Sequence, residues 1–294
     1  MTFDVNYLIK QIINGLAAGS IYALVAVGYN MVYGILGLIN FAHGDIYMFG
    51  TFIGFSLLAS VIPVPIAILI ACVAGGVIGL LVERVAYRPV RNAPRVVPMI
   101  SAMAAALILR NVAQLIWGTQ TLPFPELIPA HTFFIGEIQF NSLQLLILTI
   151  ALSLTGIFAL FVRRTKIGKA IRSVAQDIPA ARLMGININQ IIGYVYFAGG
   201  FFGVSGGILF AMYYAIWIGM GFLGTMFAWI ACIIGGIGSI EGAFVGGLLL
   251  GLFQALISGY ISSPYRDAIT YGLIMLILIF RPKGIFGQQV AEKV

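Results

Sequence analysis

Four polar side chains inside apolar stretches are the residues of this sequence best placed to do chemistry. Asn40 and His43 lie in the string NFAHGD, Arg110 lies within SAMAAALILRNVAQLIWG, and Glu241 follows a cluster of glycines. A charge at the centre of a membrane helix costs about 2.5 to 3.5 kcal/mol, so such a residue usually has a partner or a watery path. All four are therefore candidates for the lining of a polar pathway.

Each candidate also has a purely structural interpretation, which is the commoner role of such residues. Arg110 would extend toward the outer surface or pair with an acid on a neighbouring helix, although it is also the only candidate for a carboxylate contact. Asn40 and His43 would cap a half-helix end. Asp45 and Glu241 are expected close to membrane interfaces, where an exposed acid costs little.

Catalytic motifs are missing from the sequence. It has no P-loop, no HExxH, no GxSxG and no Cys/His spacing typical of a metal site. Cys72 and Cys232 both lie in apolar runs, where cysteine is most often a small core residue. The sequence therefore does not indicate an enzyme. A proton-coupled carrier usually has an acid in the middle of a span, and we expect none here, but coupling to sodium would leave no such sign.

The composition is that of a membrane protein. Hydrophobic residues make up 61% of the chain and charged residues 9%, whereas a soluble domain has about a quarter of its residues charged. The 294 residues can form about eight to ten spans of about 20 residues each. We predict one all-α polytopic membrane domain over residues 1–294, with the first apolar stretch retained as a span rather than removed as a signal peptide.

Nine spans give the most consistent count, and orientation follows from the basic residues. Loop 83–95 has four arginines, loop 163–190 has six Lys or Arg, and the tail has Arg281, Lys283 and Lys293. These segments should be cytoplasmic, loop 118–141 and the N-terminus external, and the C-terminus internal. A net charge of +7 that is gathered in short loops does not suggest nucleic acid. The predicted spans cover 7–33, 45–61, 66–82, 96–117, 142–162, 191–217, 221–240, 242–260 and 267–280.

Two glycine-containing interruptions, 34–44 and 233–242, read as broken or re-entrant helices. In each, glycines precede an acid, Asp45 or Glu241, and a further apolar run follows, which suggests two structural repeats. Unwound backbone within a membrane needs protein or water around it. Most of the 36 glycines are expected to allow close helix packing. A re-entrant element at either place would change the number of spans by one.

The polar segment 163–190 is the largest charged interruption. Its first part predicts an amphipathic helix with Ile171 and Val174 on the apolar face. Its second part predicts a short helix with Pro179 in the first turn, Asp177 as the N-terminal cap and Gly185 as the C-terminal cap. Such a segment would either fit a groove on a soluble partner or lie on anionic lipid.

The same segment carries a resemblance to a known family. Ala180, Ala181 and Gly185 match the Ala-Ala-x-x-x-Gly core by which permeases of binding-protein-dependent ABC importers contact their ATPases, although Pro179 stands where that family has Glu. The strings NGLAAGSIYALVAVGYNMVYGILGLINFAHGD, TKIGKAIRSVAQDIPAARLMGIN and GGIGSIEGAFVGGLLLG resemble high-affinity branched-chain amino acid permeases of the LivH-like group. The likeness covers nearly the whole chain.

The resemblance implies a subunit of the bacterial inner membrane that imports branched-chain amino acids by ATP-driven alternating access. Its partners would be a homologous second permease, two ATPase subunits that hold ATP and Mg, a periplasmic binding protein and membrane lipid. Pro179, Ala180, Ala181, Arg182 and Gly185 would contact the ATPase. Urea or short amides remain an alternative substrate class for the same architecture. A stand-alone carrier or channel remains the alternative of another class.

Overall fold

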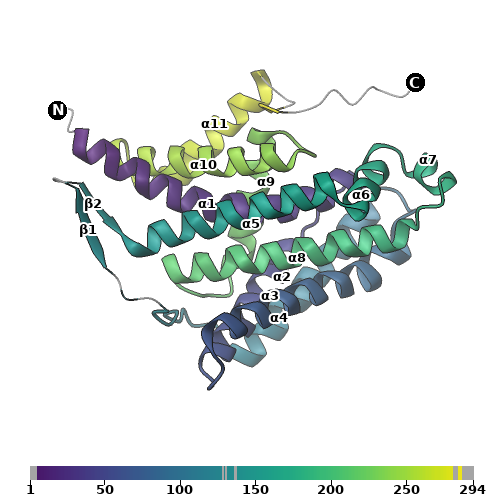
Figure 1. The fold of residues 1–294 in the computed structure, drawn as a ribbon, viewed down its shortest axis with the longest axis horizontal. Coiled ribbons are helices and arrows are strands. Elements are labelled where there is room, and N and C mark those ends of the chain that lie inside the picture. The colour runs from purple at the N-terminus through teal and green to yellow at the C-terminus, as the bar shows by residue number, and fades with distance from the viewer. Residues whose placement is uncertain (1–4, 128, 130, 136–137, 281–283, 287–294) are drawn as a thin grey trace.

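The computed structural model describes residues 5–127, 129, 131–135, 138–280 and 284–286. These residues form eleven α-helices, and the long ones lie side by side (Figure 1). A π-helical turn η1 (Glu83–Tyr87) and a 3-10 turn η2 (Arg88–Val90) follow α3. The α-helices are α1 (Val5–Leu36), α2 (His43–Leu58), α3 (Val64–Val82), α4 (Val96–Trp117), α5 (Ser142–Arg164), α6 (Lys166–Gln176), α7 (Ile178–Leu183), α8 (Ile188–Tyr213), α9 (Met220–Gly235), α10 (Ile240–Tyr260) and α11 (Arg266–Phe280).

Every predicted span corresponds to a helix, which confirms the all-α polytopic membrane fold. Six helices are long and apolar enough to cross a membrane: α1, α3, α4, α5, α8 and α10. The other three, α2, α9 and α11, have 16, 16 and 15 residues. At 1.5 Å per residue they measure about 24 Å, less than the roughly 30 Å of a hydrocarbon core. The basic tail residues Arg281, Lys283 and Lys293 lie outside the described residues.

The loop expected over residues 118–141 contains a small hairpin that the all-α prediction missed. Strands β1 (Thr132–Ile135) and β2 (Ile138–Asn141) pair antiparallel, with Phe133 opposite Phe140. The rings of these two residues stack with centroids 5.5 Å apart. Each strand is a four-residue run rich in β-branched and aromatic residues, which favours a pleated strand.

Helices α1 and α8 form the centre of the bundle and are the two most buried spans. Helix α1 packs against α10, and α8 packs against α3, along stripes of small residues. A Cβ on Gly247 would overlap the backbone of Ala23, and a Cβ on Gly251 would overlap that of Gly19. The helices therefore touch backbone to backbone, as the glycine spacing of 233–251 predicts.

The helices form two inverted halves, α1–α2–α3 and α8–α9–α10. Helices α1 and α8 run antiparallel, with Gly28 beside Gly199. Short helix α2 lies along α8, and short helix α9 lies along α1, and the first turns of α2 and α9 meet where Gly44 touches Gly221. The suggested match between 34–44 and 233–242 is therefore wrong: the connection that corresponds to 37–42 is 214–219, which links α8 to α9.

Both predicted interruptions are present as breaks between helices. Gly37 has φ +62° after α1, and Gly236 and Gly238 have φ +105° and +88° between α9 and α10. Helix α2 begins beside the middle of α8, where His43 lies against Gly203. The chain therefore turns back into the bundle between α1 and α2, and α2 occupies only part of the bundle's depth.

Candidate functional site

Helix α6 is fixed against the end of α5 at one end of the bundle (Figure 1). The hydroxyl of Thr165 accepts a hydrogen bond from the backbone N–H of Gly168 at 3.0 Å. Arg172 donates to the carbonyl of Val162, and a Cβ on Gly168 would overlap that same carbonyl. Ile171 and Val174, the predicted apolar face, are buried. Helix α6 therefore cannot slide independently of α5.

Helix α7 is a six-residue helix that is capped at both ends. The carboxylate of Asp177 accepts from the N–H of Ala180 at 3.0 Å, and Pro179 lies in the first turn. At the other end Gly185 adopts φ +80° and donates to Arg182 O at 3.0 Å, while the N–H of Ile186 donates to Ala181 O at 3.1 Å. This pair of bonds is a Schellman motif, as the glycine cap predicts.

The five residues predicted to contact an ATPase divide into one anchor and an exposed surface. Ala181 is buried, whereas Pro179, Ala180, Arg182 and Gly185 are exposed. Sequence reasoning did not single out their two apolar neighbours, Leu183 and Met184, which are 88% and 82% exposed. Large apolar side chains this exposed on a tightly tied helix favour a contact with another protein. We call residues 178–185 the α7 ledge.

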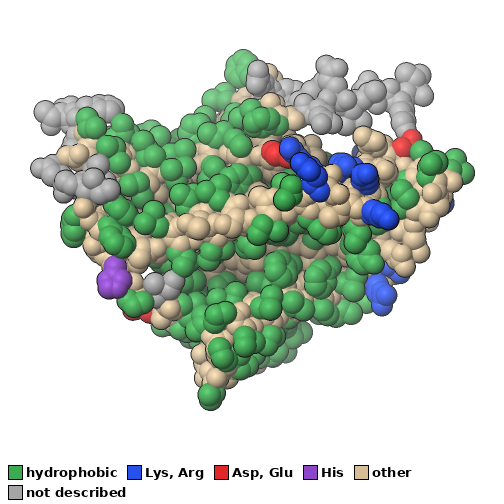
Figure 2. All heavy atoms as spheres, viewed as in Figure 1, with side chains coloured by type: hydrophobic (Ala, Val, Ile, Leu, Met, Phe, Trp, Pro, Cys, Tyr) green, Lys and Arg blue, Asp and Glu red, His purple; other side chains and the backbone are tan. Residues whose placement is uncertain are grey.

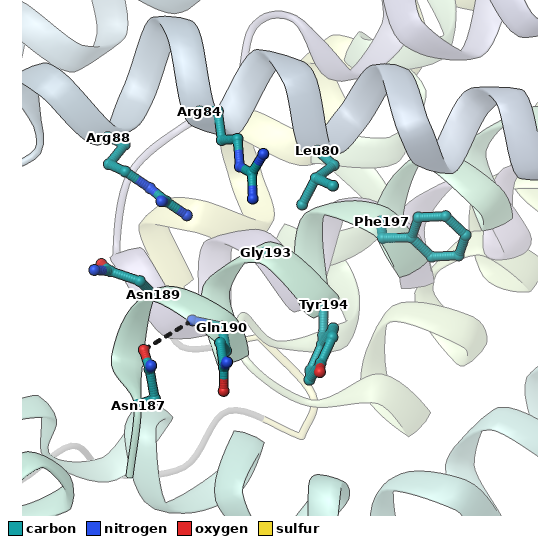
Figure 3. A pocket seen from close by; sticks show the side chains of 9 residues that line it. All are labelled: Leu80, Arg84, Arg88, Asn187, Asn189, Gln190, Gly193, Tyr194 and Phe197. Carbon is teal, nitrogen blue, oxygen red and sulfur yellow. Dashed lines mark hydrogen bonds between the residues drawn. The ribbon is translucent and has the colours of Figure 1, made fainter.

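A pocket of about 630 Å³ opens beside this ledge, between η1 and the start of α8. Figure 3 shows Arg84 and Arg88 extending across it toward Asn189 and Gln190. Arg88 is held by two hydrogen bonds to Glu83, which is buried, and Arg91 binds Asn189 Oδ1 at 2.8 Å. The basic loop 83–95 is thereby joined to the helix that follows the ledge.

Lys and Arg gather at this end of the molecule on the face in Figure 2, while the rest of that face is mainly hydrophobic. Both basic loops, 83–95 and 163–190, lie at this end. This asymmetry is typical of the cytoplasmic side of a membrane protein.

Arg110 pairs with an acid on a neighbouring helix. Its Nε and Nη2 donate to the two carboxylate oxygens of Asp45 at 3.0 and 3.1 Å. The Asp45 side chain is 2% exposed and that of Arg110 30%. The expectation that Asp45 lies at an interface, and that acids are missing from mid-span, is wrong: Asp45 is buried in the first turn of α2, which starts inside the bundle.

Asn40 and His43 are both buried at the break before α2. Asn40 Oδ1 accepts from the N–H of Ala42 at 3.1 Å, a turn just before the helix. The Nε2 of His43 lies 3.3 Å from the carbonyl oxygen of Val25, and its ring meets that of Tyr29 edge-on with centroids 5.6 Å apart. The predicted capping role is wrong, because the N-cap of α2 is Ala42 and no side chain caps this helix. The contacts of His43 tie the break to α1 instead.

Glu241 and the break before it lie beside the end of α5 and α6. Glu241 is exposed, as predicted, and binds Arg163 at the end of α5 with an N–O distance of 2.6 Å. Sequence reasoning missed Asn30 of α1, which donates to Ser239 O at 2.7 Å and accepts from the N–H of Gly238 at 2.9 Å. The Asn30 side chain thus provides a hydrogen-bond partner for two backbone groups of the unwound segment, one donor and one acceptor.

The fold and these surfaces define a multi-pass membrane permease. The family model described as "Branched-chain amino acid transport system / permease component" matches residues 11–279, and the chain belongs to this family. It is 39% identical to the high-affinity branched-chain amino acid transport system permease protein BraD of Pseudomonas aeruginosa, over 99% of both chains. It is 36% identical to the corresponding LivH of Escherichia coli K12, over 98% of both chains. No solved structure matches the chain.

Proposed function

We propose that this chain is the permease subunit of a binding-protein-dependent ABC importer that moves branched-chain amino acids across the inner membrane. The α7 ledge carries the proposal, because it is capped at both ends and presents Leu183 and Met184 to solvent. The names of relatives that match almost end to end support the substrate class. ATP and Mg would be held by two separate ATPase subunits, because the sequence has no P-loop.

The remaining partners follow from the same proposal. A homologous second permease would complete the membrane unit, and a periplasmic binding protein would dock at the end that holds the hairpin β1–β2. The N-terminus is then external and the C-terminus cytoplasmic. Closure of the ATPase dimer would displace the α7 ledge. The short connections on either side, Asp177 before it and residues 186–187 after it, would transmit this displacement to α6 and α8 as a rigid-body rotation.

The test is reconstitution of the complete transporter in proteoliposomes with labelled leucine, isoleucine and valine. We expect uptake only when ATP, both ATPase subunits and the loaded binding protein are present. Uptake that proceeds without ATP would support a stand-alone carrier or channel. Uptake of urea or a short amide, with none of the three amino acids carried, would move the protein to the alternative substrate class.

A further inference from the structure

A second polar cavity lies at the opposite end of the bundle from the α7 ledge. It measures about 230 Å³ and opens between α1, α8, α10 and the start of α11. Its polar lining comes from segments far apart in the sequence, and its remaining wall includes Ala18 and Ala255. The polar residues are Gln11, Asn14, Tyr213, Tyr214, Gln254, Ser258 and Arg266.

Gln254 leaves a hydrogen-bond donor unused in the wall of this cavity. The residue is 3% exposed, and its Oε1 accepts from the hydroxyl of Tyr22 at 3.0 Å. Its Nε2 is buried and makes no hydrogen bond within the described part of the chain. An unpaired buried donor costs roughly 1 to 3 kcal/mol. A group that accepts from this amide would remove that penalty.

Two further side chains that line the same cavity carry hydrogen-bond donors, Asn14 and Arg266. Asn14 uses its Oδ1 to accept from Gln144 Nε2 at 2.7 Å, so the group of Asn14 that remains is its NH₂. Arg266 binds Asp267 through Nε at 2.9 Å, and its other guanidinium nitrogens remain available for a ligand. An amide NH₂ from each of two helices and a guanidinium together match a carboxylate, which accepts several hydrogen bonds at once.

We propose that this cavity binds the α-carboxylate of the amino acid in transit, as an entry site on the external half of the permease. The inference rests on the proposed transport function. Arg266 and Gln254, which both line the cavity, contact the carboxylate. The aliphatic side chain lies against Ala18 and Ala255, which favours a small apolar side chain over a charged one.

The test compares Gln254→Glu and Arg266→Gln with the parent in the reconstituted transporter. Gln254→Glu keeps the shape and the acceptor for Tyr22 but replaces the free donor with an oxygen. Asn92→Asp, the same amide-to-carboxylate change at an exposed position in loop 83–95, is the matched control. We expect each pocket variant to lower initial leucine uptake about tenfold or more. Complex assembly and the ATPase rate stimulated by the loaded binding protein should stay at the parent level.

Two other outcomes would overturn the proposal, and they can be told apart. Parental uptake in both variants would show that the cavity holds no substrate. A rise in the binding-protein concentration needed for ATPase stimulation, with uptake per ATP unchanged, would assign the pocket to a carboxylate of the docking protein. If Gln254→Glu fails to assemble, Arg266→Gln decides, because Arg266 is partly exposed at the start of α11. A parent transporter that carries no amino acid would refute the proposed function rather than the site.

Discussion

The guanidinium of Arg110 on α4 donates one hydrogen bond to each carboxylate oxygen of the buried Asp45 on α2, at 3.0 and 3.1 Å. Removing one member of a buried ion pair leaves the other uncompensated, which costs about 3 to 5 kcal/mol. We expect the loss of stability in Arg110→Ala to lie near the low end of this range, because the Arg110 side chain is partly exposed. Thermal unfolding in detergent should show a large loss of stability.

The double variant Asp45→Asn/Arg110→Gln provides the control for this pair. It removes both charges together, so it should recover most of the stability lost in Arg110→Ala. Normal stability of Arg110→Ala together with low uptake would instead assign the residue to the translocation path.

Gly185 ends the α7 ledge with a positive φ of +80°. A side chain in this conformation costs about 1 to 2 kcal/mol. Gly185→Ala should therefore loosen the ledge and lower ATP-coupled uptake severalfold, with the membrane level unchanged. Gly156→Ala is the matched control, because a Cβ at Gly156 on α5 meets nothing within 4 Å. Equal uptake by the two variants would show that coupling does not depend on the glycine cap at the end of the α7 ledge.

Gly247 allows α10 to touch α1 backbone to backbone. Gly247→Ala would push a methyl group into Ala23, and such overpacking costs about 1 to 3 kcal/mol. We expect a lower melting temperature in detergent. Gly272→Ala on α11, where a Cβ meets nothing within 4 Å, should leave the melting temperature at or above the parent value. A parental melting temperature for Gly247→Ala would rule out the close contact.

Asn30 bridges the break between α9 and α10 through Gly238 and Ser239. Asn30→Leu removes both hydrogen bonds and leaves buried backbone groups unpaired, at about 1 to 3 kcal/mol. Hydrogen exchange of residues 236–242 should accelerate about tenfold or more. Asn111→Leu is the control, since the hydrogen bond of Asn111 among the described residues stays within its own helix, to Leu107 O. Unchanged exchange in Asn30→Leu would mean that the break is held by other contacts.

Local signals were sufficient for the spans and for the α7 ledge. Apolar runs predicted each helix, and the order of Asp177, Pro179 and Gly185 predicted both ends of α7, because capping depends on neighbours within a few residues. The apolar stretches did not predict where each helix begins within the bundle. Apolar character over 45–61 and 221–240 does not reveal that α2 and α9 begin inside the bundle.

Contacts between distant segments were beyond the reach of the sequence. The partner of Arg110 lies 65 residues away, and that of Asn30 more than 200 residues away. Asp45 looked like an interface residue because the break before it resembles a surface loop. The cavity between α1, α10 and α11 was hidden for the same reason: Asn14, Gln254 and Arg266 meet only after these helices pack together.

The most direct test of the proposed coupling is recovery of the ATPase subunits with affinity-purified permease carrying Leu183→Asp. Leu183 is 88% exposed, so the charge should leave the permease folded but spoil an apolar contact. Val61→Asp, at an exposed position between α2 and α3, is the control. We expect Leu183→Asp to lose the ATPase subunits and Val61→Asp to retain them. Full recovery with Leu183→Asp would show that the ATPases bind elsewhere than the α7 ledge.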